Sequence, residues 1–225
     1  MGCPLVTQLV RHGVGPQPPG RIWIVDGDVV SQRNLIGTEY RESHVGTGKA
    51  AALAGIAREI DSRVNVFYWD RMLSVTNQAD VEQLARQSDL LCLVADSFDL
   101  MLRIADRCHE HCPQVMAAFG AHADCAEVAF STPGQNQALR TTLGRETRTA
   151  ITQPQALGCD TAFVVNFVVA LCLQLLTGQR TGLQIVPIRN DAPLYLIGLR
   201  RVWLFENQPP DVIRSVLSIG TTPTP

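Results

Sequence analysis

The sequence predicts a Rossmann-like α/β domain with a mainly parallel sheet, helices on both faces of that sheet and antiparallel strands late in the chain. Short strands that are apolar along their length alternate with helical segments, and such strands are typical of a parallel sheet covered on both faces. The chain has 225 residues, of which 46% are hydrophobic and 18% charged, enough for one sizeable core. We therefore expect a single domain over residues 1–220 and a disordered tail at 221–225.

The N-terminal third supplies two helices and two strands. Apolar residues at helical spacing predict a helix over Gly2–Val14, which ends in a turn rich in glycine and proline. The short apolar segment Ile22–Val25 predicts a strand, and β-branched and aromatic residues predict another at Val64–Trp69. Between the two strands, alanine, leucine and isoleucine on one face of Lys49–Ile60 predict an amphipathic helix.

The middle of the chain continues this alternation. We expect a helix at Val81–Arg86, a fully apolar strand at Leu90–Ala95, a helix at Leu100–Cys112 and a strand at Gln114–Phe119. An alternation of this kind favours parallel strands joined by helical crossovers.

The C-terminal half has a different character. Cys125–Ser131 is interpreted as an antiparallel strand, and the polar segment 132–155 as a long crossover loop that is mobile until a ligand binds. Cys159–Thr177 predicts an apolar helix, and late strands are expected at Gln184–Ile188 and Leu194–Phe205.

Composition excludes several classes of protein. The net charge of −2 gives no basic surplus for nucleic-acid binding. The longest apolar stretch, Ala162–Leu176, is too short and too often interrupted by polar residues to span a membrane, and the first residues do not resemble a signal peptide. Seven cysteines scattered through apolar segments fit a reducing cytoplasm better than a disulfide scaffold. We expect a cytoplasmic protein without nucleic-acid or membrane partners.

Lys49 is the only lysine among the 19 lysine and arginine residues. Lysine presents a compact point charge where arginine presents a planar fork, so a lone lysine in an arginine-rich chain is a candidate for a role that needs an ammonium. Two glycines, Gly46 and Gly48, precede it at the start of a predicted helix, a suitable place for a phosphate. The alternative is a solvated lysine with no specific role.

Two aspartates directly follow predicted strands. Asp26 comes after Ile22–Val25, and Asp96 after the apolar strand Leu90–Ala95. Ligands of open α/β sheets bind at the carboxyl ends of strands, where a carboxylate can accept hydrogen bonds from ribose hydroxyls. The alternative is that each aspartate only caps backbone amides in a turn.

The spacing of these residues resembles the ThiF/MoeB/HesA family, the bacterial relatives of ubiquitin-activating enzymes. The family pattern is Asp-x-Asp-x-Val, then Asn-Leu, then Val-Gly-x-x-Lys, and this chain has Asp26–Val30, Asn34–Leu35 and Val45–Lys49. Further matches follow in family order: Gly2–Gly15 as the end of the glycine-rich loop with its helix, Ala95–Ser97 in place of Thr-Asp-Asn, and Leu176–Gly178 as Leu-Thr-Gly.

The resemblance implies adenylation of the C-terminal carboxylate of a ubiquitin-like or sulfur-carrier protein, with ATP and Mg²⁺. Carried over by position, Asp26 with Asp28 would hold the ribose, Asn34 would face the phosphates, and Lys49 would neutralise charge on the reacting nucleotide. Attack of a carboxylate on the α-phosphate requires this kind of alignment and positive charge.

The resemblance points to five other residues. Gly2 would be the last glycine of the nucleotide-binding loop, and Asp96, next to Ser97, would bind Mg²⁺ or the triphosphate. Many members pass the acyl group to a cysteine; here Cys159, at the start of the apolar helix where the helix dipole favours a thiolate, is the first candidate and Cys125 the second, with an ordinary buried thiol as the alternative for each. Members commonly dimerise through the apolar helix, so a homodimer is expected.

The chain departs from the family pattern in the phosphate-binding elements. The first strand and most of the Gly-x-Gly-Gly-x-Gly loop do not appear before Gly2, so the sequence is truncated, begins at a misassigned start, or belongs to a degenerate relative. The family places x-Arg-Gln after Asn-Leu, where this chain has Ile36-Gly37-Thr38; Arg33 and Arg41 lie nearby but out of register. An arginine expected about five residues after the Thr-Asp-Asn equivalent is replaced by Met101.

We expect no zinc, because the two Cys-x-x-Cys pairs of the family's structural site are absent. Cys108 and Cys112 lie one helical turn apart and present two ligands on one face, short of the four that a structural zinc requires.

Two other functions remain open. A catalytically degenerate relative would keep the fold as a binding or dimerisation partner. A nicotinamide-dependent oxidoreductase would also use an acidic residue after the second strand, but the chain shows no residue suited to hydride transfer and gives Val-Gly-x-x-Lys no role.

Overall fold

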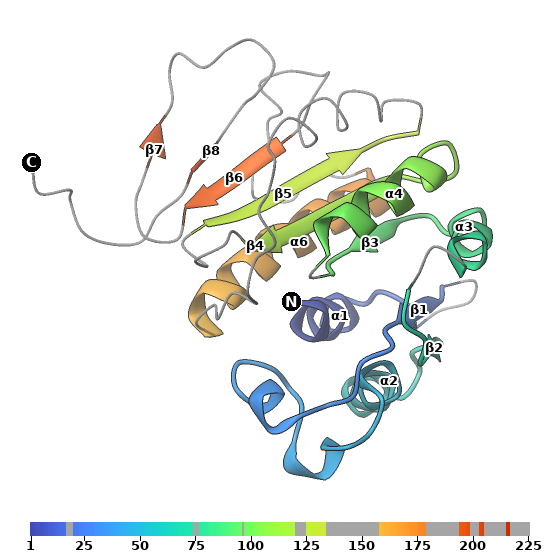
Figure 1. The fold of residues 1–225 in the computed structure, drawn as a ribbon, viewed down its shortest axis with the longest axis vertical. Coiled ribbons are helices and arrows are strands. Elements are labelled where there is room, and N and C mark those ends of the chain that lie inside the picture. The colour runs from blue at the N-terminus through green and yellow to red at the C-terminus, as the bar shows by residue number, and fades with distance from the viewer. Residues whose placement is uncertain are drawn as a thin grey trace, which may run out of the picture. The chain divides into compact units, whose positions relative to one another are not determined.

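The structure is a computed structural model, and the residues it describes fall into two compact units. The described residues are 1–16, 20–73, 77–95, 97–119, 125–133, 158–178, 194–198, 203–204 and 215–216 (Figure 1). One unit comprises Met1–Gln78 with Leu157–Val169, and the other Ala79–Ala156 with Ala170–Pro225. The expectation of a single domain over residues 1–220 stays a prediction.

The first unit contains a two-stranded parallel sheet and the first two long helices. β1 (Ile22–Val25) pairs with β2 (Val66–Trp69) in parallel, with Ile22 opposite Val66. Two short 3₁₀ helices and two α-helices complete the elements of its N-terminal part: α1 (Gly2–Arg11), η1 (Gln32–Leu35), η2 (Glu42–His44) and α2 (Lys49–Ile60). The chain leaves α1 through Gly13, whose φ of 83° lies in the left-handed region that favours glycine.

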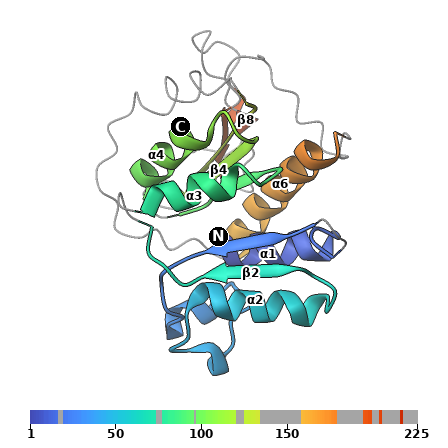
Figure 2. The same cartoon turned by 90° about the vertical axis from the view of Figure 1, so that its right-hand side faces the viewer.

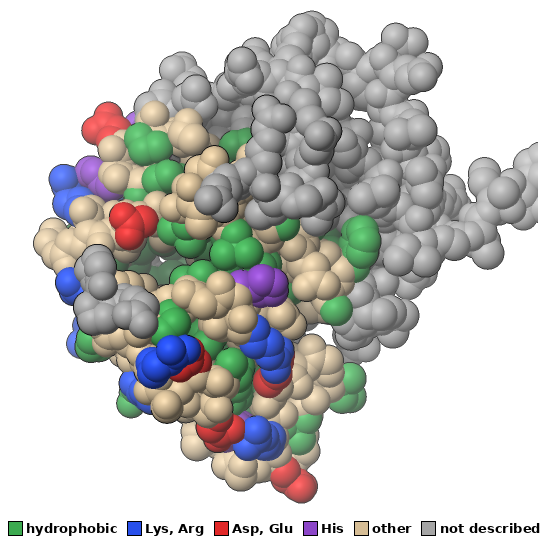
Figure 3. All heavy atoms as spheres, turned by 180° about the vertical axis from the view of Figure 1, so that it is seen from behind, with side chains coloured by type: hydrophobic (Ala, Val, Ile, Leu, Met, Phe, Trp, Pro, Cys, Tyr) green, Lys and Arg blue, Asp and Glu red, His purple; other side chains and the backbone are tan. Residues whose placement is uncertain are grey.

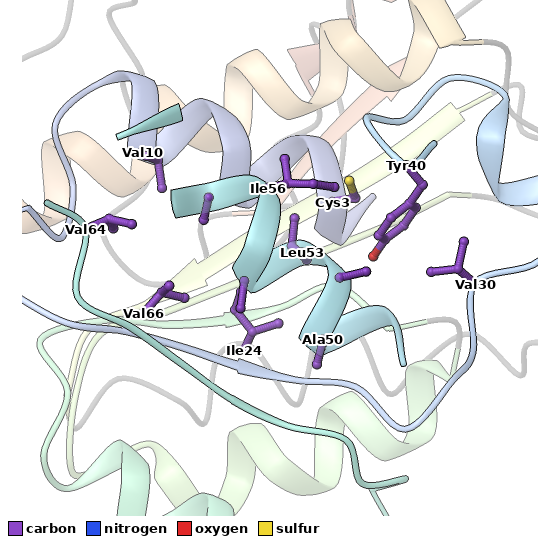
Figure 4. Close-up of a cluster of buried hydrophobic side chains, with 13 residues drawn as sticks. Cys3, Val10, Ile24, Val30, Tyr40, Ala50, Leu53, Ile56, Val64 and Val66 are labelled. Atoms are coloured by element: carbon purple, nitrogen blue, oxygen red, sulfur yellow. The ribbon is translucent and has the colours of Figure 1, made fainter. Parts of the chain in front are cut away.

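A compact core joins α1, α2 and the two strands. Figure 4 shows its side chains, among which Ala50, Ala54 and Ala57 of α2 are completely buried. Because these alanines are small, α2 can pack closely against both the strands and α1. Val30 and Tyr40, which come from the connection between β1 and α2, belong to the same core, so their side chains hold the loops that follow β1 against this core.

The second unit is built on a four-stranded mixed sheet. The strand order is β3-β4-β5-β6, in which β3 (Leu91–Leu93) is parallel to β4 (Gln114–Phe119). β5 (Cys125–Ser131) is antiparallel to both β4 and β6 (Leu194–Gly198). The first four residues of β4, Gln114–Ala117, are all buried, so both faces of this strand are covered.

Helices cover both faces of this sheet. α4 (Phe98–Cys108) lies on one face and the C-terminal half of α6 (Gly158–Thr177) on the other, as the two views show (Figures 1 and 2). The remaining elements are α3 (Gln78–Ala85) and the antiparallel pair of β7 (Trp203–Leu204) with β8 (Ser215–Val216). None of the described helices is long and apolar enough to cross a membrane.

The fold class predicted from the sequence is confirmed, with parallel strands, helices on both faces and late antiparallel strands. Two helices end several residues earlier than predicted: α1 ends at Arg11 rather than Val14, and α4 ends at Cys108 rather than Cys112. Pro113 disfavours helical geometry in the residue before it, and residues 109–112 form a turn instead. The predicted strand Gln184–Ile188, most of the loop 132–155 and the tail 221–225 lie outside the described residues.

Candidate functional site

The loop that follows β1 is hydrogen-bonded to the turn that precedes α2. Val29 and Gly48 form an isolated antiparallel bridge, and the Lys49 backbone N–H donates to the Asp28 carbonyl at 2.8 Å. Gly46 permits the turn, since its φ of 89° is left-handed. These bonds bring residues about 20 positions apart in the sequence into one local structure at the carboxyl end of β1.

The side chains of Lys49 and Asp28 meet within this structure. The Lys49 Nζ lies 2.7 Å from Asp28 Oδ2, and the two side chains are 20% and 47% exposed. An ion pair this accessible to water contributes about 0.2–1 kcal/mol. A phosphate can therefore compete for the ammonium at little cost, while the pair keeps the charge in place without a ligand.

Asp26 closes a turn on the other side of Asp28. Its backbone N–H donates to the Trp69 carbonyl of β2 at 3.2 Å, and its Oδ1 accepts the Asp28 backbone N–H at 2.8 Å. The Asp26 carboxylate thus accepts a backbone amide hydrogen bond in a turn, as one of the two interpretations of the sequence expected. The same hydrogen bond fixes the backbone of Asp28, whose side chain pairs with Lys49, so the turn also positions the ion pair.

Asn34 caps its own 3₁₀ helix, and its Oδ1 accepts both the backbone N–H and the hydroxyl of Ser31 at 2.9 Å. Two arginines, Arg33 and Arg41, lie near the position where the family has an arginine. Arg41 forms an ion pair with Glu59, with 2.8 Å between Arg41 Nη2 and Glu59 Oε2. Arg33 is exposed and, among the residues that the structure describes, makes no hydrogen bond or ion pair. Arg33 is therefore the better placed of the two to meet a phosphate.

Tyr40 and Glu39 fasten the connection between β1 and α2 to its surroundings. The buried Tyr40 hydroxyl donates to the Lys49 carbonyl at 3.2 Å, and burial raises the pKa of Tyr40, which keeps the phenol protonated as a donor. Glu39 accepts hydrogen bonds from the Thr7 hydroxyl at 2.7 Å and the Cys3 thiol at 3.4 Å, both on α1. The site loop is thus tied to both α1 and α2.

The sequence interpretation missed Asp70. This aspartate directly follows β2, and its Oδ1 accepts the Ala51 backbone N–H in the first turn of α2 at 3.2 Å. A carboxylate after an apolar strand is the same signal that singled out Asp26, so the sequence pattern could have found it.

The other predicted site residues lie elsewhere or beyond the described residues. Asp96 is outside the described residues. Ser97 belongs to the second unit, where its Oγ accepts the Leu100 N–H at 3.3 Å and caps α4. Cys159 lies in the first turn of α6 and Cys125 begins β5, but their side chains are outside the described part of the chain. Gly2 is the first residue of α1.

Four of the described thiols are poor nucleophiles, because their pKa is raised. Burial raises the pKa of Cys3 and of Cys112 to about 12 and that of Cys108 to about 11. The Cys172 thiol, whose Sγ lies 3.6 Å from that of Cys92, has its pKa raised by this contact and by burial. Within the described ranges, no group of three or more histidine, cysteine, aspartate or glutamate side chains is arranged to hold a metal ion.

Comparison with known families decides the assignment. The model of the ThiF family matches residues 1–194. The chain belongs to the ThiF family. Its Asp-x-Asp and Val-Gly-x-x-Lys segments are the two parts that the structure brings together as the Asp28–Lys49 pair.

Solved structures share the fold at low sequence identity. Escherichia coli MccB, in a crystal structure with ATP, matches with a TM-score of 0.60 and 16% identity over 78% of this chain and 52% of that one. A crystal structure of PaaA matches with a TM-score of 0.61 and 17% identity over 88% of this chain and 66% of that one. The ThiF-family chain thus spans about half the length of the MccB chain. No curated protein matches it.

Proposed function

We propose that this ThiF-family chain is an ATP-dependent adenylyltransferase that activates the C-terminal carboxylate of a peptide or small carrier protein. The observation that carries the proposal is the Lys49–Asp28 pair at the carboxyl end of β1, in which the ammonium lies 2.7 Å from the Asp28 carboxylate and Asp26 accepts the Asp28 backbone N–H. Family membership and the likeness to MccB, one structure of which holds ATP, support adenylyl transfer as the type of chemistry.

In the proposed reaction an oxygen of the substrate carboxylate attacks the α-phosphorus of ATP. A new P–O bond forms, the bond to the β-phosphate breaks, and pyrophosphate leaves with the electron pair to give an acyl adenylate. The reaction needs alignment and positive charge rather than a protein nucleophile. Lys49 supplies that charge by exchanging the Asp28 carboxylate for phosphate oxygens.

The donor set around the pair fits a nucleotide. Asp26 and Asp28 offer carboxylate oxygens to the ribose hydroxyls, Asn34 faces the phosphates with its amide, and Arg33 stands in for the missing arginine. Bound Mg²⁺ would neutralise charge on the triphosphate, and the family pattern makes Asp96 with Ser97 the proposed place for it. The same pattern makes Gly2 the last glycine of the nucleotide-binding loop.

The proposed substrate is the C-terminus of a ubiquitin-like or sulfur-carrier protein. Other structures of E. coli MccB hold MccA, which supports a peptide or protein substrate for this fold. On the described part of the face drawn in Figure 3, acidic and basic side chains are interspersed rather than gathered into a basic surface. We further propose a cytoplasmic homodimer that assembles through α6, and Cys159, ahead of Cys125, as the thiol that accepts the acyl group.

ATP–pyrophosphate exchange tests the proposal. The chain, mixed with ATP, Mg²⁺, labelled pyrophosphate and a carrier protein ending in Gly-Gly, should incorporate label into ATP, and Lys49→Met should lower the rate of incorporation about 10²–10³-fold. Asp61→Asn is the matched control, because Asp61 caps the opposite end of α2. Exchange that is absent in the native chain, or unchanged in Lys49→Met, would refute the proposal.

A degenerate binding or dimerisation protein is the second candidate, and one observation favours it. Gly37, in the place of the family's phosphate-binding arginine, has a φ of 73°, a conformation that an arginine side chain rarely adopts. An arginine at position 37 would therefore be strained in the backbone conformation that this chain adopts. This alternative predicts no pyrophosphate exchange and no rise in melting temperature with ATP. Family membership favours either of these functions over hydride transfer.

A further inference from the structure

The first turn of α2 takes its cap from another element. The N-cap residue is Gly48, which has no side chain to accept a hydrogen bond, and no side chain of the helix itself caps it. Instead Asp70 Oδ1, from the end of β2, accepts the N–H of Ala51, the third residue of the helix, at 3.2 Å. An N-cap side chain normally makes this bond.

The carboxylate of Asp70 lies where a side chain at position 48 would begin. A Cβ at Gly48 would lie 2.5 Å from Asp70 Oδ1 and 2.6 Å from its Cγ, closer than Cβ atoms approach other atoms. The φ of Gly48 is −58°, which any residue adopts, so a side chain at position 48 fits if the exposed Asp70 carboxylate moves away from the Ala51 N–H. Asp70 therefore occupies the volume that an ordinary N-cap side chain would fill.

Two aspartates hold the residue next to Gly48. Lys49 begins α2, and Asp28 binds both its backbone N–H and its ammonium. Asp70 binds the same helical turn from the end of the neighbouring strand. The carboxyl ends of β1 and β2 thus each contribute a carboxylate to the turn that carries the lone lysine.

We propose that Asp70 is a positioning residue for Lys49. From the end of β2 it caps the first turn of α2 and fixes that turn, so that the Lys49 ammonium stays beside Asp28. A carboxylate is suited to this place because the helix N-terminus carries a partial positive charge. The link to ATP rests on the proposed function, but the capping itself does not.

The lone lysine makes the proposal measurable with a lysine-specific endoproteinase. This protease has one cleavage position in the chain, after Lys49, and it cuts only when the first turn of α2 opens. Under native conditions Asp70→Ala should accelerate cleavage about fivefold, the effect of losing one helix cap. Asp70→Asn, which keeps an acceptor oxygen, should stay within about twofold of the native rate.

A second substitution tests the spatial argument. Gly48→Ser should accelerate cleavage in the native background, where its side chain meets Asp70. In the Asp70→Ala background the same serine has room and can cap the helix itself, so the rate should return towards the native value. Asp61→Ala, at the other end of α2, is the control. Without denaturant, cleavage after Lys49 depends on local opening of the first turn of α2, so this variant should be cleaved at the native rate.

The NMR signal of the Lys49 side chain gives a second measurement. A general loss of stability does not shift this signal in the folded protein, whereas a change in the surroundings of the ammonium does. Isotope-labelled lysine yields a single side-chain resonance, since the chain has one lysine. Asp28→Asn should shift this resonance, and Asp70→Ala should shift it in the same direction in the folded protein. If Asp70→Ala changes neither the resonance nor the cleavage rate, the proposal is overturned. If both change while the native chain shows no pyrophosphate exchange, the positioning role stands and the enzymatic function fails.

Discussion

The helices α2 and α4 both follow strands of an α/β sheet, yet they begin in different ways. α4 is capped by its own Ser97, whose hydroxyl accepts the Leu100 N–H. The N-cap residue of α2 is Gly48, which has no side chain, and the helix is capped instead by the Asp70 carboxylate at the end of β2. We call this a borrowed cap. A helix with its own cap starts independently of its neighbours, whereas a borrowed cap makes the first turn of α2, and Lys49 within it, depend on how β2 ends.

The difference extends to the packing below the two helices. α2 presents alanines and Leu53 to a core shared with the site loops, because Val30 and Tyr40 lie in that core. α4 buries the larger Met101 and Ile104. The loops of the first unit are thus mechanically coupled to the helix that carries the candidate site.

Removing core volume under α2 should have the largest effect. Leu53→Ala should lower the free energy of unfolding by about 2–5 kcal/mol, because Leu53 is buried and its loss leaves a cavity. Ile104→Ala in α4 should cost a similar amount by the same mechanism. Chemical denaturation measures both; only Leu53→Ala should also accelerate endoproteinase cleavage at Lys49 at low denaturant. Equal acceleration by both variants would show that the two helices are not independent.

Removing the ammonium should come next in size. Lys49→Met should lower pyrophosphate exchange about 10²–10³-fold, the usual consequence of losing one group that stabilises charge in a transition state. Lys49→Arg should restore only part of the rate, since a planar guanidinium does not reproduce a point charge beside Asp28. Both variants should unfold within about 1 kcal/mol of the native chain, because an accessible ion pair contributes little to stability.

The caps themselves should give smaller effects. Ser97→Ala should lower the free energy of unfolding by about 1 kcal/mol through the loss of the α4 cap. Cleavage at Lys49 should remain at the native rate in this variant. A rate that rises as much as in Asp70→Ala would remove the distinction between a helix with its own cap and one with a borrowed cap.

The C-terminal end of α2 should show the smallest effect, as a change in acid stability. Hydrogen bonds from Arg63 lower the pKa of Asp61 to about 2. A carboxyl group with a lowered pKa stabilises the fold above its unfolded pKa of about 4, and that contribution is lost as the pH falls towards 2. Asp61→Asn should flatten the acid limb of the stability profile in this window. An unchanged acid limb would show that the Asp61–Arg63 contact has no role in solution.

Elements with local signals were predicted with their bounds. The strands Ile22–Val25 and Gln114–Phe119 and the helix Lys49–Ile60 appear in the structure as expected. In each case, the residues themselves carry the apolar pattern that the sheet or core requires. The C-terminal end of α4 was placed too late because apolar periodicity continues into a turn that Pro113 enforces.

The candidate site was predictable only in part. The ordered motifs indicated Asp28 and Lys49, and the structure joins them at 2.7 Å. Asp70 carries the signal that singled out Asp26, a carboxylate directly after an apolar strand, and could have been predicted as a site residue. Its partner could not, because the Ala51 N–H lies on a different element and no sequence spacing relates the two residues.

Titration of the labelled chain with ATP tests the central claim most directly, because the lysine side-chain resonance belongs to Lys49 alone. Saturable movement of this resonance away from its Asp28-paired position, abolished by Asp26→Ala with Asp28→Ala, is the result we predict. A resonance that stays in place at millimolar ATP, in a chain that remains folded, would contradict the assignment of Lys49 to the phosphates.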